Sequence, residues 1–299
     1  MRILIGIDGS PKSLDAVRLV GRLACPEADA VAFCFSPTEL ERQLPGRSPA
    51  VVEAAVAALG EEARGLLPEA CGRRAEFIRV AKPPAIGLLD TAAEWRADML
   101  VVGARGHGSI EGFLLGSVSR AVVHGAGLPV LVARRPVPEG RGLTALVCHH
   151  PASAAAVAAV LGRLHWASGT DGRVIGVAES LLAGRLPDWL EQRVRDPDTA
   201  AIAKAWEQEH DAEVAALEGT LRGFQATLPE PFRGQDPIVA QGNPGERILE
   251  RAAADATDLV VVGRTPTDAL SRWLLGSTSE AVLTHAQASV LIVPVEKQA

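Results

Sequence analysis

The sequence predicts two α/β domains in tandem, each a doubly wound, five-stranded parallel sheet with helices on both faces. Apolar runs without polar alternation are separated by segments of helical spacing, which is typical of a parallel sheet buried on both faces. One module also occurs twice: the stretch 101–106, followed by Gly116-Ser117, returns 160 residues later as 261–266, followed by Gly276-Ser277. This offset is about one domain length and indicates an internal duplication.

Each element of the first half follows from a local pattern. Short apolar runs predict strands over 3–7, 30–35, 75–80, 99–102 and 130–133. Helical spacing predicts helices over 13–24, 51–67, 84–95 and 117–124, the third of them with Pro84 at its start. The segment 134–142 is rich in Pro, Gly and Arg, which favours a linker. We therefore expect a first domain over 1–135.

The second half repeats this order and should form a domain over 143–296. Its strands are predicted near 143–147, 174–178, 237–240, 259–262 and 290–293. When Pro11 is aligned with Pro151, the module starts are only 140 residues apart, so about twenty extra residues are expected near 180–210. The charged stretches 188–195 and 199–221 are predicted to be mostly helical. We expect this region to contribute to the core and to the solvated surface; the alternative is that it forms a surface for a protein partner.

Composition excludes several classes of protein. The 299 residues are 47% apolar, enough for two cores of roughly 150 residues each. A net charge of −6 gives no indication of a basic surface that would bind nucleic acid. No apolar run approaches the roughly 20 residues that span a bilayer. Cys25, Cys34, Cys71 and Cys148 lack metal-ligand spacing and are predicted to be buried thiols in a reducing compartment. A cytoplasmic protein is expected, with no nucleic acid or membrane partner.

The loops that follow the strands carry the chemistry. Ligands of a doubly wound sheet lie outside the carboxyl ends of the strands, where Asp8 and Gly103 are predicted to be. Gly103 and Gly106 are expected to adopt positive φ and let the backbone approach a phosphate, while Gly116-Ser117 would present helix N-terminal amides to it. Asp8 suits an adenine amino group or a ribose hydroxyl, although a helix cap or an Asx turn is the structural alternative.

These residues together resemble a known pattern. Asp8-Gly9-Ser10 after the first strand, with Gly103, Gly106, Gly116 and Ser117 spaced as G-x2-G-x9-G-S, resembles the ATP-binding pattern of the universal stress protein family. Both halves show the resemblance, so it covers nearly the whole chain. It implies the strand order 3-2-1-4-5, a fold of the flavodoxin-like and adenine-nucleotide-hydrolase-like type, and ATP at the strand ends. It also implies pairing of the fifth strands, here 130–132 with 290–292.

The resemblance assigns roles to residues of the first half. Asp8 would hold the adenine or the ribose, with Ile7 and the backbone around Cys34 enclosing the base. Arg105 and His107 are second-rank candidates, equally compatible with phosphate contact and with solvated loop charges. ATP, with or without Mg²⁺, is the expected cofactor. The ribose and the phosphates would be held by Gly103, Gly106, Gly116, Ser117, Val118 and Ser119, with both serines as hydroxyl donors.

The second half departs from the pattern twice. In the alignment on the prolines, Cys148 replaces the aspartate, and Pro266 replaces the second glycine, which removes an amide and restricts φ. One competent nucleotide site is therefore predicted, with a weak anion site left open at Gly276-Ser277. The pair His149-His150 has no third ligand spaced for a metal, so no metal site is expected.

We expect an ATP-binding stress-response or regulatory protein. A slow ATP hydrolase and an interaction scaffold with a structural nucleotide are the alternatives. The sequence lacks a Walker A GxxxxGK[ST] motif and an SGGxDS loop, and no base and nucleophile pair accompanies the site, so no catalytic residue is assigned. The expected partners are an adenine nucleotide and an unidentified protein, with pairing of the two halves inside the chain; a homodimer is left open.

Overall fold

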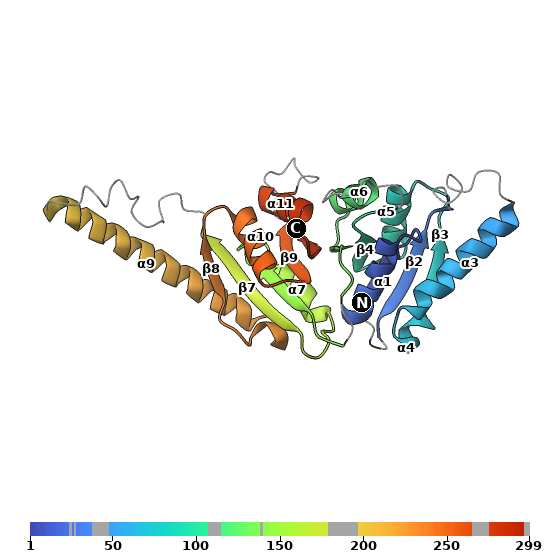
Figure 1. The fold of residues 1–299 in the computed structure, drawn as a ribbon, viewed down its shortest axis with the longest axis horizontal. Helices are drawn as coiled ribbons and strands as arrows, with labels where there is room; N and C mark the ends of the chain where they lie inside the picture. Colours follow the sequence, from blue (N-terminus) through green and yellow to red (C-terminus); the bar gives the residue numbers. More distant parts are fainter. Residues whose placement is uncertain are drawn as a thin grey trace.

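The computed structural model describes residues 1–23, 26, 28–37, 48–106, 115–137, 140–178, 197–264 and 275–295. Its first half alternates strands and helices in the predicted order (Figure 1). The strands are β1 (Arg2–Gly6), β2 (Ala30–Phe35), β3 (Glu76–Arg79), β4 (Met99–Gly103) and β5 (Val130–Ala133). The helices are α1 (Pro11–Leu23), α3 (Pro49–Gly65), α4 (Glu69–Gly72), α5 (Pro84–Glu94) and α6 (Ser117–Gly125).

The second half repeats this order, with one much longer helix. Its strands are β6 (Thr144–Cys148), β7 (Asp171–Ala178), β8 (Ile238–Gln241), β9 (Leu259–Arg264) and β10 (Ser289–Pro294). Its helices are α7 (Ala154–Arg163), α9 (Pro197–Ala226), the 3-10 turn η1 (Glu230–Phe232), α10 (Pro244–Ala254) and α11 (Ser277–His285).

All ten strands form one continuous sheet in the order β3-β2-β1-β4-β5-β10-β9-β6-β7-β8. Each half therefore has the predicted order 3-2-1-4-5, and every pair within a half is parallel. The halves join through β5 and β10, which pair antiparallel with Leu131 opposite Leu291. The expected pairing of the fifth strands is thus present within the chain.

Two apolar layers cover the two faces of this sheet, and each layer runs through both halves. Ile3 and Ile5 point into one layer with helices α1, α3, α7 and α9, whereas Leu4 points into the other with α5, α6, α10 and α11. Successive residues of a strand point to opposite faces, so burial on both faces requires apolar residues at every position. This is why the strand sequences show no polar alternation.

The inserted region contains one of its two predicted helices, longer than expected. The helix predicted over 199–221 is α9, a helix of 30 residues whose N-terminal part extends well beyond the sheet (Figure 1). Its C-terminal part packs on β7, where a Cβ added to Gly176 would lie 2.7 Å from Leu221. The helix predicted over 188–195 lies outside the described residues. Among the helices that are described, none is long and apolar enough to cross a bilayer.

Candidate functional site

The turn between β1 and α1 positions Asp8 at the carboxyl end of the sheet. Gly9 has a φ of 80°, and one carboxylate oxygen of Asp8 accepts a hydrogen bond from the Ser10 amide at 2.9 Å. This is the Asx turn considered as the structural alternative for Asp8. This turn uses one carboxylate oxygen of Asp8. The other oxygen, Oδ2, faces Gly106 across the site, where a Cβ built on Gly106 would lie 2.3 Å from it.

The two loop glycines have steric roles, and the expected positive φ at both of them is wrong. Neither Gly103 nor Gly106 is among the glycines with positive φ. A Cβ on Gly103 would lie 2.7 Å from the carbonyl carbon of Lys12 and 2.9 Å from the amide of Ser13, so this glycine lets α1 begin against β4. Gly106 instead leaves room beside the Asp8 carboxylate. The first glycine serves packing and the second shapes the site.

The N-terminus of α6 opens into the same place. Gly116 is its N-cap, and no side chain that the structure describes caps the first turn. The Gly116 amide itself donates to the Ala104 carbonyl at 2.8 Å, which ties the helix start to the end of β4. The amides of the following residues, including Ser117, lie in the first turn, where a helix attracts anions.

Ser119 has a different role from the one expected. Its hydroxyl donates to the Gly103 carbonyl at 2.6 Å, and in the second half Ser279 makes the same bond to Gly263 at 2.8 Å. A hydroxyl has one proton to donate, so Ser119 is not an available donor for phosphate in this conformation. Because the bond recurs in both halves, it is a structural feature of the repeat.

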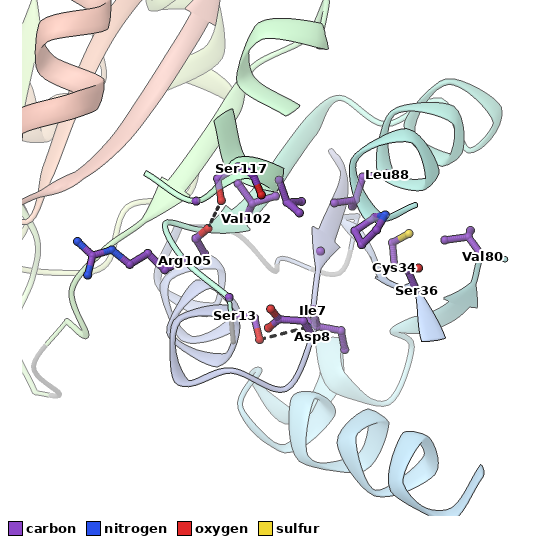
Figure 2. Close-up of a pocket in the computed structure, with 17 residues that line it drawn as sticks. Ile7, Asp8, Ser13, Cys34, Ser36, Val80, Leu88, Val102, Arg105 and Ser117 are labelled. Atoms are coloured by element: carbon purple, nitrogen blue, oxygen red, sulfur yellow. Dashed lines mark hydrogen bonds between the residues drawn. The ribbon is translucent and has the colours of Figure 1, made fainter. Parts of the chain in front are cut away.

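A cavity joins these parts at the carboxyl ends of β1, β2 and β4 (Figure 2). Its apolar wall includes Ile7, Val80, Leu88 and Val102, and its polar wall includes the Asp8 carboxylate. Of the residues assigned from the sequence, those that line the cavity are Ile7, Asp8, Cys34, Gly103, Arg105, Gly106, Gly116, Ser117, Val118 and Ser119. His107 lies outside the described residues.

Sequence reasoning missed several lining residues, some of which had a positional signal. Ser36 and Val80 directly follow β2 and β3, so they lie at the same sheet edge as Asp8. Ser13 and Leu88 line the cavity from α1 and α5. Their helical spacing gave no indication of this position, because it also fits ordinary core packing.

Arg105 and Cys34 differ in how they lie at the cavity. Figure 2 shows that the Arg105 guanidinium points away from the Asp8 carboxylate and from the other labelled side chains. We infer that Arg105 lines this cavity with its backbone and not with its charged group. Burial raises the pKa of the Cys34 thiol to about 11, against the opposing effect of a hydrogen bond with Thr91, so the thiol is neutral and poorly nucleophilic at neutral pH.

The strand pairing of the second half gives residue equivalences at its first strand that differ from those of the sequence alignment. The Ile7 amide donates to the Cys34 carbonyl at 3.0 Å, and the His149 amide donates to the Ile175 carbonyl at 2.8 Å. His149 therefore occupies the position of Ile7. Cys148 consequently matches Gly6 and not Asp8, so the predicted replacement of aspartate by Cys148 is wrong.

The start of the following helix completes the comparison. Ser13 donates from its amide to the Ser10 carbonyl at 3.0 Å, and Ser153 does so to the His150 carbonyl at the same distance. His150 thus corresponds to Ser10, directly after the counterpart of Ile7. The second turn is two residues shorter, and the segment Asp8-Gly9 has no counterpart. Pro11 and Pro151 occupy equivalent positions at the start of the helix, but the offset of 140 residues that they set does not extend back across the turn to the strand.

The histidines of this turn are accounted for by local contacts. The His149 ring lies 5.1 Å from the Phe224 ring, and burial, together with the neighbouring His150, lowers the pKa of His149. His150 Nδ1 accepts a hydrogen bond from the Ala152 amide at 3.2 Å. In the part of the chain that the structure describes, no group of three or more His, Cys, Asp or Glu is placed to hold a metal ion. Pro266 lies outside that part.

Known proteins resemble this chain in sequence and in fold. The sequence profile of the universal stress protein family matches residues 1–134 and 186–294. The chain belongs to this family. A universal stress protein of Mycobacterium tuberculosis is 27% identical over 318 residues, covering 97% of this chain and 94% of that protein. A universal stress protein of Mycobacterium bovis is 36% identical over 140 residues, which spans 44% of this chain and 45% of that relative.

The solved structures agree on the tandem universal stress protein fold. A universal stress protein from Archaeoglobus fulgidus superposes with a TM-score of 0.59 at 18% identity, covering 100% of this chain and 97% of the other. A functionally unknown protein from Pseudomonas aeruginosa gives 0.60 at 14% identity, with 98% and 92% covered. Both matches span the two halves, so the tandem fold recurs in other chains.

Proposed function

We propose that the first half binds ATP in the cavity beside Asp8 and that the chain acts as a nucleotide-dependent regulatory protein of the stress response. The observation that carries this proposal is one cavity that combines an apolar wall, a carboxylate and the start of α6. An adenine nucleotide needs these three surfaces for its base, its sugar and its phosphates. Membership of the universal stress protein family supports the same role.

The apolar part of the cavity suits a flat base. Ile7 directly follows β1 and Val102 belongs to β4, whereas Val80 follows β3 and Leu88 comes from α5. Burial of a planar aromatic ring between aliphatic side chains is favourable by about 25 cal/mol for each Å² of apolar surface removed from water. The second carboxylate oxygen of Asp8, which accepts no hydrogen bond from the described residues, then accepts one from a ribose hydroxyl or from the adenine amino group.

The phosphate end relies on backbone amides. The first turn of α6 supplies Ser117 and Val118, and the helix dipole adds about 0.3–1 kcal/mol of attraction for an anion. No lysine is among the described residues that line the cavity, and Arg105 points away from Asp8. Mg²⁺ would therefore supply most of the positive charge for a triphosphate when the nucleotide is bound.

The second half should not bind a nucleotide in the same way. Its shorter turn lacks Asp8-Gly9, and His149, in place of Ile7, packs against Phe224. We therefore expect one ATP per chain. The second half would instead complete the continuous sheet, through the pairing of β10 with β5.

Titration calorimetry with ATP, with and without Mg²⁺, tests this proposal. We expect one equivalent per chain. Asp8→Asn keeps the acceptor of the Asx turn and removes the charge, so it should weaken binding without unfolding the turn. Ser117→Ala should weaken binding, whereas Ser277→Ala at the equivalent position of α11 should leave affinity unchanged.

Other outcomes would count against the proposal. Two equivalents per chain would show that the shortened turn is compatible with binding. Equal losses in Ser117→Ala and Ser277→Ala would point to a general effect on the fold. An assay of phosphate release by the purified protein, with multiple turnovers that disappear in Asp8→Asn, would replace a binding role by hydrolysis.

A further inference from the structure

A second cavity lies between the two halves, next to the first. It has a volume of about 330 Å³, within the roughly 300–1,000 Å³ typical of small-ligand sites. Arg105 lines both cavities, and Figure 2 shows its guanidinium extending away from the first one. The lining residues of the second cavity are Lys12, Ala104, Arg105, Arg134 and Arg135 from the first half and Ala286 and Gln287 from the second. We call it the interdomain cation cavity.

The described residues that line this cavity carry charge of one sign. Four of these seven residues are cationic, and none of the seven is acidic. Burial and, to a smaller extent, the positive charge of Arg105 together lower the pKa of Arg134 to about 10. Like charges gathered in a hollow with protein walls repel one another and raise the local concentration of counter-anions.

Two of the arginines are held in position by the second half. One Nη of Arg134 donates to the Leu283 carbonyl near the end of α11, and its backbone amide donates to Ser289 Oγ at 3.2 Å. Arg135 donates to the Gln287 side chain. The Nε of Arg134 is buried, and no described atom accepts its hydrogen bond. The second half therefore orients the guanidinium groups and leaves one buried donor for a ligand.

The duplication supplies an internal comparison. At the positions of the second half that correspond to Arg134 and Arg135, the chain has Pro294 and Val295, and the counterpart of Lys12 is Ala152. A cluster of four cations is thus gathered on this side, whereas the described residues at the corresponding place on the other side include one arginine, Arg264 at the position of Ala104, which donates to backbone carbonyls of the first half. A charge cluster needed for pairing of the β5 and β10 strands would be expected on both sides, because that pairing is symmetric.

We propose that the interdomain cation cavity binds the phosphate chain of a polyanion, of the class of pyrophosphate and inorganic polyphosphate, at a site separate from the nucleotide cavity. Guanidinium groups match pairs of phosphate oxygens with two parallel hydrogen bonds, and the lysine adds a compact charge. The Nε of Arg134 would find its acceptor in a phosphate oxygen. Residues of both halves form the site, so it exists only in the joined molecule.

Titration calorimetry of the full chain with sodium tripolyphosphate tests this proposal. Arg135→Gln and Lys12→Gln should each weaken binding about tenfold, and the affinity should fall steeply with salt. Arg73→Gln is the matched control, because Arg73 is an exposed arginine paired with Glu69 on the far side of the first half from this cavity's lining. It should leave tripolyphosphate affinity unchanged.

Two further titrations distinguish binding in the interdomain cation cavity from binding in the nucleotide cavity. The tripolyphosphate titration is repeated with ATP at saturation and in Asp8→Asn, and we expect unchanged affinity in both cases. Competition by ATP would overturn the separate site and would assign the anion to the start of α6. Absence of tripolyphosphate binding in the wild-type chain, or equal weakening in Arg73→Gln, would overturn the proposal and leave the assignment of ATP to the first cavity untouched.

Discussion

Arg120 of α6 and Glu280 of α11 form an ion pair at 3.2 Å, although they occupy the same position of the repeated helix. His124 lies 3.4 Å from the same glutamate. In a symmetric pair of two identical first halves, Arg120 would face Arg120. In this chain the contact is instead between opposite charges. This favours pairing of unlike halves over pairing of like halves.

Reversing one charge of this pair should destabilise the chain. Glu280→Arg should lower the free energy of unfolding by about 1 kcal/mol, and adding Arg120→Glu should recover part of the loss. Both side chains are partly exposed, so the coupling in a double-mutant cycle should be about 0.2–1 kcal/mol. Denaturant unfolding of the four chains measures it. The Arg222–Glu218 pair within α9 is the control, since its reversal should not change the contact between halves.

The two loop glycines should respond differently to alanine. Gly103→Ala places a Cβ against the backbone of Lys12, which cannot move without shifting α1, so we expect about 1–3 kcal/mol of lost stability. Gly106→Ala meets only a carboxylate oxygen of Asp8 and should mainly weaken ATP binding. Thermal unfolding and calorimetry on both variants separate the effects. A larger loss of stability in Gly106→Ala than in Gly103→Ala would contradict this assignment.

The serine bond shared by both halves should have a similar energy in each. Ser119→Ala and Ser279→Ala each remove a hydroxyl bond to a strand-end carbonyl and should cost about 1 kcal/mol. Neither should change ATP affinity by as much as Ser117→Ala. If Ser119→Ala abolished ATP binding while remaining as stable as Ser279→Ala, its hydroxyl would have to turn toward the ligand.

Asp98 should make stability depend on pH. Burial opposes its charged form, but hydrogen bonds from the Arg2 amide and the Arg163 side chain outweigh it and lower the pKa of Asp98 below 3.8. Its contribution is therefore fully present above pH 4 and is lost as the pH falls through the lowered pKa. The stability difference between the wild type and Asp98→Asn, measured by urea unfolding, should be constant near neutral pH and shrink below pH 4.

Arg163 extends this test across the two halves. It belongs to α7 and contacts Asp98 of the first half at 2.9 Å. Arg163→Gln should raise the pKa of Asp98 and so move the acid loss of stability to higher pH. An unchanged acid profile in this variant would show that the Arg2 amide alone holds the carboxylate.

Local patterns were sufficient for most of the fold and for much of the site. Buried strands and amphipathic helices have their own periodicities, so the bounds of β2 and β5 agree with the predicted residues. The cluster of Asp8, Gly106 and Gly116 followed from the rule that strand ends of a parallel sheet share one edge. The extent of α9 did not follow, because its packing on β7 depends on residues distant in the chain.

The errors come from features that a linear pattern does not contain. A hydrophobic pattern does not reveal that a turn has lost two residues, so extending the correct match of Pro11 with Pro151 back across the turn pairs Cys148 wrongly with Asp8. Only the hydrogen bonds between neighbouring strands fix which residue stands beside Cys34 and which beside Ile175.

The sequence by itself determined the duplication, the class of fold and the residues at the strand ends of the first half. These depend on spacing within segments of about ten residues, where side-chain burial and backbone geometry are local. Only the tertiary structure decided that the two turns differ and that Arg105, Arg134 and Lys12 meet in one cavity. Such relationships depend on strand register and on the contact between halves, which are set by packing over more than one hundred residues of chain.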